Sequence, residues 1–236
     1  PVAIGPATAV TLTADTGDAI NAWLAENGFM IPTADQAIVD AYAGPGRYFI
    51  AIRRSAAAVE SSASSVGIHF TLAGDQRALP LRFAHLGAGP TVGFTVLVAA
   101  DDVVAPSAPL AALTLSDLDT VLLRATGYAP AVTSAVAQHG NHAFLIEGTW
   151  PGASLLGSRW PSLLPIIRAD QTVTRLSTML PATALDSDAV FDQAFNGTVP
   201  HQIHVERTNT PSGRSRFAAA FALFAIAAVV RRRPRR

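Results

Sequence analysis

The stretch TVGFTVLVAA (residues 91–100) decides the fold class, because β-branched and aromatic residues fill it and predict a strand. Three earlier stretches have the same character, and short turns such as Gly74-Asp75-Gln76 lie between them. They are RYFIAIRR (47–54), VGIHFTLA (66–73) and ALPLRFAHL (78–86). These connections leave little room for the crossover helices of a parallel sheet. We therefore predict an antiparallel meander over residues 47–100.

Two short helices are predicted before this meander. In DTGDAINAWLAENGF (15–29) the apolar residues Ile20, Trp23 and Leu24 fall on one helical face. After Pro32, the spacing of Thr33 and Gln36 is that of a capping box, and the helix is expected to end at GPG (44–46).

Helical periodicity returns after the meander. Asp117 or Asp119 is placed to cap TVLLRATGYAPAVTSAVAQ (120–138), which Gly127 and Pro130 are expected to break into two pieces. Further strands are predicted at HAFLIEG (142–148) and TVTRLSTML (172–180). The fold class is therefore α+β: a single domain over residues 1–208, with an N-terminal helical pair on an antiparallel sheet, a second helical region, further strands and a C-terminal apolar helix.

The formal net charge of zero conceals two unlike parts. The chain has 17 arginines and no lysine, and seven of the arginines lie in residues 214–236. The remainder has ten arginines against 17 acidic residues, a net charge of −7, which argues against binding of nucleic acid. Absence of cysteine excludes disulfides, thiolate zinc sites and cysteine nucleophiles. Because the chain begins at Pro1, we expect it to be a fragment or a processed product, truncated at its N-terminus.

The C-terminal tail has the composition of a membrane segment. A polar linker (209–216) precedes fourteen apolar residues, Phe217–Val230, and an arginine cluster (231–236) follows them. As a helix of about 1.5 Å per residue the segment reaches roughly 21 Å, short of a hydrocarbon core of about 30 Å. It is nevertheless apolar on all faces, and flanking arginines are able to snorkel. The predicted anchor residues are Phe217, Phe221, Leu223, Phe224, Ile226, Val229 and Val230.

Five arginines after this segment set the expected topology. They are Arg231, Arg232, Arg233, Arg235 and Arg236. The positive-inside rule places them in the cytoplasm and the body outside the cytoplasmic membrane, in the bacterial cell envelope. A transmembrane or sorting-tag helix is the favoured interpretation. A buried core helix, a helix lying on a surface and a nucleic-acid-binding cluster are the less favoured alternatives.

Two H-x-x-H pairs are the candidate metal ligands. His139 and His142 lie in HGNH, and His201 and His204 lie in PHQIH. Neither context is helical: the first pair reads as a loop and the second as extended chain, which would point the two rings to opposite faces. We therefore favour incidental histidines over a metal site, and predict neither catalytic residues nor a cofactor.

Three other features of the sequence are candidates for binding or catalysis. Asp101-Asp102 and the run Asp186, Asp188 and Asp192 could hold a divalent cation, although solvated loops are the more ordinary interpretation. Trp150 and Trp160 flank a proline-rich stretch that could present an aromatic ledge to a sugar or a peptide, or pack as partial core. GAGPTVG (87–93) lacks the spacing of a dinucleotide loop, and no G-x-S-x-G occurs.

Five stretches together resemble a family of exported bacterial proteins, the domain of unknown function numbered 2330. They are INAWLAENGFMIP (20–32), YFIAIRR (48–54), ALPLRFAHL (78–86), LIEG (145–148) and VTRLSTMLPATALDSDAVF (173–191). The resemblance covers roughly residues 8–195 and implies that the chain is the C-terminal part of the family domain. It brings no catalytic residues with it.

This resemblance implies export and attachment at the cell surface. Members often end in a tag of the myxobacterial type, and the tail here resembles that tag but lacks its cysteine. We therefore expect a surface-anchored protein with a non-enzymatic binding or structural domain. Its expected partners are the lipid bilayer and a sorting protease, and no ligand of the body can be named. The alternative is an exported metal-dependent hydrolase that uses the histidine pairs.

Overall fold

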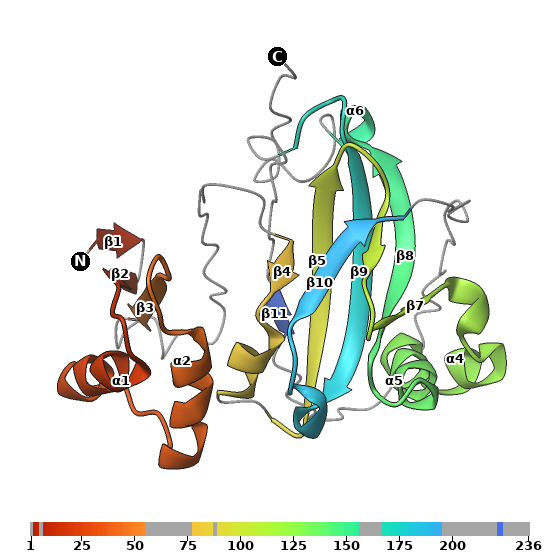
Figure 1. Ribbon diagram of the computed structural model, residues 1–236. Helices are drawn as coiled ribbons and strands as arrows, with labels where there is room; N and C mark the ends of the chain where they lie inside the picture. Colours follow the sequence, from red (N-terminus) through yellow and green to blue (C-terminus); the bar gives the residue numbers. More distant parts are fainter. Residues whose placement is uncertain are drawn as a thin grey trace. The chain divides into compact units, whose positions relative to one another are not determined.

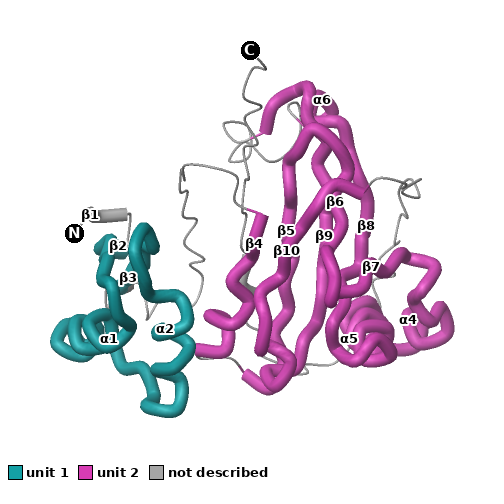
Figure 2. The backbone as a smooth tube through the Cα atoms, viewed as in Figure 1, with its two compact units in different colours: residues 1–72 teal, residues 73–236 magenta. Residues whose placement is uncertain are grey.

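The computed structural model describes residues 2–4, 7–54, 77–86, 89–155, 167–194 and 221–223. The chain divides into two compact units, residues 1–72 and 73–236 (Figure 2). Helices and several sheets are present, so the α+β class is confirmed. The predicted domain of residues 1–208 spans both units and stays a prediction, and the predicted linker 209–216 lies outside the described residues.

Unit 1 is a three-stranded antiparallel sheet with a helical pair between its second and third strands. The strands are β1 (Val2–Ile4), β2 (Ala7–Leu12) and β3 (Phe49–Arg54), in the order β1-β2-β3. The helices are α1 (Gly17–Glu26) and α2 (Gln36–Tyr42). Ile20 of α1 and Val39 of α2 are buried, which confirms the predicted pair and the apolar face of its first helix.

The two helix starts of unit 1 differ in their caps. The Thr16 hydroxyl accepts a hydrogen bond from the Ala19 N–H at 3.4 Å. The capping box predicted at Thr33 is wrong, because residues Thr33–Asp35 form a 3₁₀ turn without a side-chain cap. Thr33 is already inside this turn, so it does not take the extended backbone conformation that an N-cap requires.

Unit 2 is built on a five-stranded mixed sheet in the order β11-β5-β9-β8-β7. Its strands are β5 (Thr91–Ala100), β7 (Ala111–Leu113), β8 (Ala143–Pro151), β9 (Thr172–Pro181) and β11 (Phe221–Leu223). β9 is antiparallel to both β5 and β8, whereas β7 runs parallel to β8 and β11 runs parallel to β5. The strands predicted at 142–148 and 172–180 are thus confirmed.

A second, antiparallel sheet in the order β4-β10-β6 covers one face of the large one. Its strands are β4 (Ala78–Leu79), β6 (Val104–Pro106) and β10 (Ala189–Gln193). β10 crosses in front of β5 and β9 in Figure 1. The Val104 N–H donates to the Thr174 hydroxyl of β9 at 3.2 Å, which places the small sheet on the face of β9 that carries Thr174.

Three helices complete unit 2: α4 (Thr120–Thr126), α5 (Tyr128–Gln138) and α6 (Gly152–Leu155). Gly127, with φ of 93°, separates α4 from α5, so the predicted break there is confirmed. The break predicted at Pro130 is wrong: Pro130 lies in the first turn of α5, where the missing N–H costs no helical hydrogen bond. Asp119 caps α4 by accepting from the N–H groups of Val121 and Leu122.

The predicted meander over residues 47–100 is wrong in its pairing. β3 joins the sheet of unit 1, whereas β5 pairs along all ten residues with β9, far along the chain. The stretch 78–86 forms only the two-residue β4, followed by the 3₁₀ helix Leu81–His85. Pro80 explains this ending, because it has no N–H to donate to a ladder. The stretch 66–73 lies outside the described residues.

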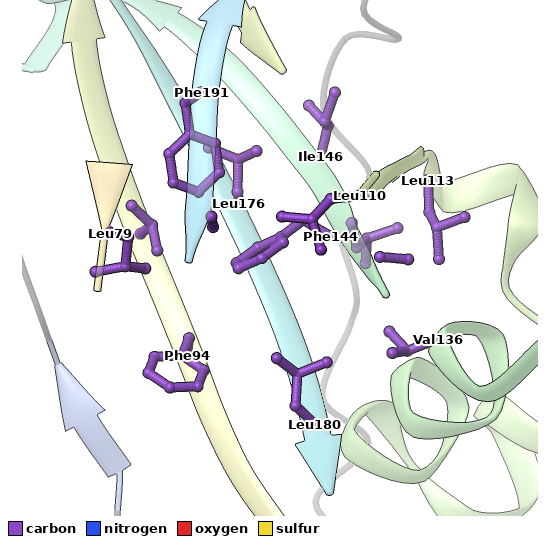
Figure 3. Packing of buried hydrophobic residues seen from close by; sticks show 14 of the residues in the cluster. Leu79, Phe94, Leu110, Leu113, Val136, Phe144, Ile146, Leu176, Leu180 and Phe191 are labelled. Carbon is purple, nitrogen blue, oxygen red and sulfur yellow. The ribbon is translucent and has the colours of Figure 1, made fainter. Parts of the chain in front are cut away.

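The core of unit 2 lies between its two sheets and against α5. Phe144 of β8 is fully buried and meets Phe191 of β10 edge to face, with ring centroids 5.4 Å apart and planes at 83° (Figure 3). Val132 and Val136 of α5 join the same cluster. The alternation of β5, with Val92, Phe94, Val96 and Val98 buried, is that of a strand with one face in the core.

The predicted apolar helix at Phe217–Val230 is wrong for residues 221–223. These residues form β11, in register with Gly93–Thr95 of β5. A sheet edge with unpaired N–H and C=O groups offers an extended segment a partner, and Phe and Leu favour strands that pack against a sheet. In the described part of the chain, no helix has both the length and the apolar character needed to cross a membrane. The rest of the segment lies outside the described residues.

Candidate functional site

A β-bulge in β8 introduces Glu147 into the large sheet. Ile146 pairs with Leu176 and Gly148 pairs with Arg175, so Glu147 is the extra residue between these two pairs. Bulges redirect side chains and are common beside functional sites. Arg175 and Ser177 lie two positions apart on β9 and therefore on one face of the sheet, and the bulge places Glu147 on that same face.

Four side chains, Tyr128, Glu147, Arg175 and Ser177, form what we call the polar cluster. The Tyr128 hydroxyl donates to Glu147 Oε1, and the Arg175 guanidinium forms an ion pair with Glu147 Oε2 through Nε. Ser177 Oγ lies 2.9 Å from the Tyr128 oxygen. Tyr128 comes from the first residue of α5, so the cluster joins this helix to β8 and β9. Glu147 is the acceptor at its centre.

The buried environment fixes the protonation of Tyr128. Burial raises its pKa most, and the negative charge of Glu147 and the hydrogen bond to it raise the pKa further. The hydrogen bond from Ser177 and the charge of Arg175 act in the opposite direction without cancelling this effect. Tyr128 therefore stays neutral and donates to Glu147. Ser177 in turn donates to Tyr128, which gives a directed chain of hydrogen bonds ending at the carboxylate.

The ion pair of the cluster is asymmetric in its exposure. The Glu147 side chain is 12% exposed, whereas the Arg175 side chain is 40% exposed. Arg175 Nε is buried beside Glu147 without the geometry of a hydrogen bond. Solvent on this face therefore meets the cation rather than the anion of the pair.

Trp150 lies on the same face, two residues after Gly148. A Cβ added to Gly148 would lie 3.1 Å from the nearest ring carbon of Trp150, so the indole passes over the glycine. Arg175 is the cross-strand partner of Gly148, and cross-strand neighbours have Cβ positions about 5 Å apart. The indole, which is neither fully buried nor fully exposed, thus lies over the cross-strand partner of Arg175 on the same face of the sheet.

The family match covers the N-terminal part of the chain, less than half of its length. Residues 1–108 match the model of a family described as an uncharacterized protein conserved in bacteria (DUF2330). Over these residues the chain is similar to that family, and we call residues 1–108 the DUF2330 segment. No significant match was found among curated proteins or solved structures.

The DUF2330 segment contains unit 1 and the unit 2 strands β4, β5 and β6. It includes three of the five stretches that carry the predicted resemblance, those within residues 20–32, 48–54 and 78–86. Residues 109–195, including the stretches 145–148 and 173–191, lie beyond it, and their membership stays a prediction. The polar cluster and Trp150 also lie beyond the DUF2330 segment.

The structure describes two of the four candidate histidines, His139 and His142. His139 Nδ1 lies 3.1 Å from the Ala135 carbonyl oxygen. His142 Nδ1 lies 2.8 Å from the Gly140 carbonyl oxygen, and His142 Nε2 lies 3.4 Å from Asp186 Oδ1. Residues 201 and 204 lie outside the described residues. Among the described side chains, no group of three or more His, Cys, Asp or Glu residues could hold a metal ion. The four-histidine site, and the hydrolase that depends on it, stay predictions.

The acidic residues noted in the sequence have separate partners. Asp192 accepts from Arg77 at 2.8 Å and from the Ser107 hydroxyl at 2.6 Å, and these two contacts lower its pKa. Asp188 accepts from the Arg82 N–H, and Asp186 faces His142. The three acidic residues of the run 186–192 therefore contact different partners. Trp160 lies outside the described residues, so the structure places only Trp150 of the two tryptophans in the predicted aromatic ledge.

The polar cluster itself was missed by sequence reasoning. The sequence pattern predicts a strand that contains Glu147, and nothing in the sequence links this residue to Tyr128 or Arg175. An acidic residue inside an otherwise apolar strand, directly before a glycine, was the available signal, because buried charges are normally paired.

The raised pKa of Tyr128 predicts a delayed ionisation. An unperturbed tyrosine ionises near pH ~10. Because the folded pKa lies above the unfolded value, the stability that the neutral phenol contributes is complete below pH ~10 and is lost as pH rises through the folded pKa. In a titration followed by phenolate absorbance, we expect one late ionisation step in the folded chain that Tyr128→Phe removes. If Tyr128→Phe instead removes an ionisation step near pH ~10, the assignment of the late step to Tyr128 is contradicted.

Proposed function

We propose that this chain contains a non-enzymatic binding domain of an exported bacterial protein, attached to the cell surface through its C-terminal segment. The observation that carries the proposal is the juxtaposition of Trp150 and Arg175 on one face of the sheet. Aromatic and arginine side chains are the residues most often used as binding anchors. Residues 1–108 match a family that is conserved in bacteria, which agrees with the bacterial origin that the proposal assumes.

The polar cluster supports binding because it fixes this face in advance. Tyr128 and Glu147 are engaged with each other, and Glu147 contacts the Nε side of Arg175. A guanidinium that is already oriented loses less side-chain entropy when a ligand binds. The groups with acid–base chemistry thus serve to position the cation, which suits recognition rather than turnover.

The binding proposal is tested with isolated bacterial sacculi and surface polysaccharide. We expect the full chain to sediment with this material without releasing products from it, and Trp150→Ala to reduce the bound fraction about tenfold, a loss in the range of a binding hot spot. Trp23→Ala is the matched control, because Trp23 stacks on Phe29 within unit 1. Release of cleaved products, or equal sedimentation of Trp150→Ala, would overturn the proposal.

The attachment proposal rests on the apolar tail and its flanking arginines. In hydrocarbon each backbone polar group needs a partner within the membrane-embedded segment or a closed barrel, so a lone strand cannot insert. Insertion of the tail therefore requires that residues 221–223 leave β5. The bilayer is the partner in this proposal, with the body outside and the arginine cluster cytoplasmic. Processing by a sorting protease stays a prediction.

Deletion of residues 214–236 is expected to release a folded body from the membrane fraction when the chain is exported. Among the described contacts of unit 2, the deletion removes the three residue pairs between β11 and β5. Cell fractionation locates the product, and circular dichroism compares its unfolding with that of the full chain. Persistence in the membrane fraction would contradict attachment through the tail, and unfolding would show that the tail belongs to the core.

A further inference from the structure

The exposed end of Arg175 is an unused bidentate donor. A guanidinium has five N–H groups, and in Arg175 the Nε side faces Glu147. Its two terminal nitrogens make no hydrogen bond or ion pair with the described residues, and the side chain is 40% exposed. The two terminal nitrogens of a guanidinium match the two oxygens of a carboxylate.

The surrounding charges favour an anion at this end. Glu147 balances the guanidinium, but its own side chain is 12% exposed and is turned to Tyr128 and Nε. The cross-strand neighbours on both sides are neutral: Leu97 of β5 lies opposite Arg175, and Gly148 lies opposite on β8. A ligand carboxylate at the outer end of Arg175 would therefore meet positive charge, with the compensating carboxylate buried behind it.

The neighbouring indole adds a second requirement on the ligand. Trp150 passes over Gly148, the cross-strand partner of Arg175, and so lies on the face of the sheet that carries Arg175. A ligand that uses both groups must carry its carboxylate directly beside a flat apolar surface. A sugar acid does so, because its carboxylate is attached to the ring whose C–H face can lie on the indole. In an extended peptide, neighbouring side chains on one face are further apart, at about 7 Å.

We propose that the face formed by Trp150 and Arg175 binds a carboxylate-bearing saccharide. Arg175 holds the carboxylate, Trp150 lies against the sugar ring, and Glu147 and Tyr128 are positioning residues that act through Arg175. This inference rests on the proposed binding function and adds the chemical class of its ligand.

The test compares an oligogalacturonate with its uncharged methyl ester by isothermal titration calorimetry on the full chain. We expect the acid to bind at least about tenfold more tightly than the ester, because the ester cannot form the charged bidentate pair. Arg175→Gln is expected to abolish this preference, and Arg175→Lys to reduce it, because lysine keeps the charge but not the fork. Trp150→Ala is expected to weaken both ligands.

Arg168→Gln is the control, since Arg168 is a similarly exposed arginine that pairs with Asp170. If Arg175→Gln fails to fold, the comparison of acid and ester with wild type and Arg175→Lys still decides the matter. Equal affinity for acid and ester, or a preference that both Arg175 variants retain, would overturn the proposal. So would equally tight binding of an oligoglutamate. If these results occur while sedimentation with sacculi still depends on Trp150, the ligand class fails and the binding function stands.

Discussion

Replacing Phe144 by alanine is expected to lower the free energy of unfolding of unit 2 by about 3–5 kcal/mol. Phe144 is fully buried between the sheets, and its ring meets the edge of Phe191 (Figure 3). The substitution removes both the transfer free energy of the ring and its packing contacts, because a rigid two-sheet interior collapses only partly around the cavity. Denaturant unfolding followed by circular dichroism measures this loss.

The matched control for this prediction is Val190→Ala. Val190 neighbours Phe191 in β10, but the residue is 39% exposed and its side chain points to the other face of the strand. Val190→Ala should lower the free energy of unfolding by well under half as much as Phe144→Ala, because less apolar area is removed from the interior. A loss below about 1 kcal/mol for Phe144→Ala would show that the two sheets do not pack as described.

Replacing Glu147 by alanine is expected to lower the free energy of unfolding by about 2–4 kcal/mol. The variant leaves the Tyr128 hydroxyl without its acceptor and the buried Nε of Arg175 without its counter-charge. The expected loss is below that for a fully buried ion pair, because the Arg175 side chain is 40% exposed and solvent screens its charge. Denaturant unfolding of the variant and of Glu147→Gln provides the comparison. Glu147→Gln keeps an acceptor oxygen and should lose less.

A double-mutant cycle separates the cluster from general damage to the strand. In the variant that combines Glu147→Ala with Tyr128→Phe, the second substitution should add little, since its hydrogen-bond partner is already absent. Fully additive losses would show that Tyr128 and Glu147 do not act together, and would also remove their role in positioning Arg175.

Local features of this protein followed from local sequence. The periodicity of Ile20, Trp23 and Leu24 predicted α1, and Gly127 predicted the break between α4 and α5. The β-branched runs predicted β3, β5 and β9. Each of these depends on residues a few positions apart, where backbone sterics and the helical or strand repeat act directly.

The pairing of strands that are distant in sequence could not be predicted from local patterns. β5 was expected to pair with its neighbours in sequence, but it lies against β9, and β3 lies in a different unit. Several antiparallel partners satisfy the alternation of an apolar strand equally well. The choice among them depends on which combination buries all the apolar faces together, which is a property of the whole core.

The sequence by itself determined the α+β class, the helical pair, the main strands, the charge division between body and tail, and the resemblance that residues 1–108 confirm. Only the tertiary structure decided the strand order, the extended form of residues 221–223 and the polar cluster. Tyr128, Glu147 and Arg175 are separated by 19 to 47 positions and meet only because a bulge in β8 and the start of α5 bring them to one face of β9. Local repeats act between residues near in sequence, whereas a buried charge is stabilised by whichever partner the completed fold places beside it.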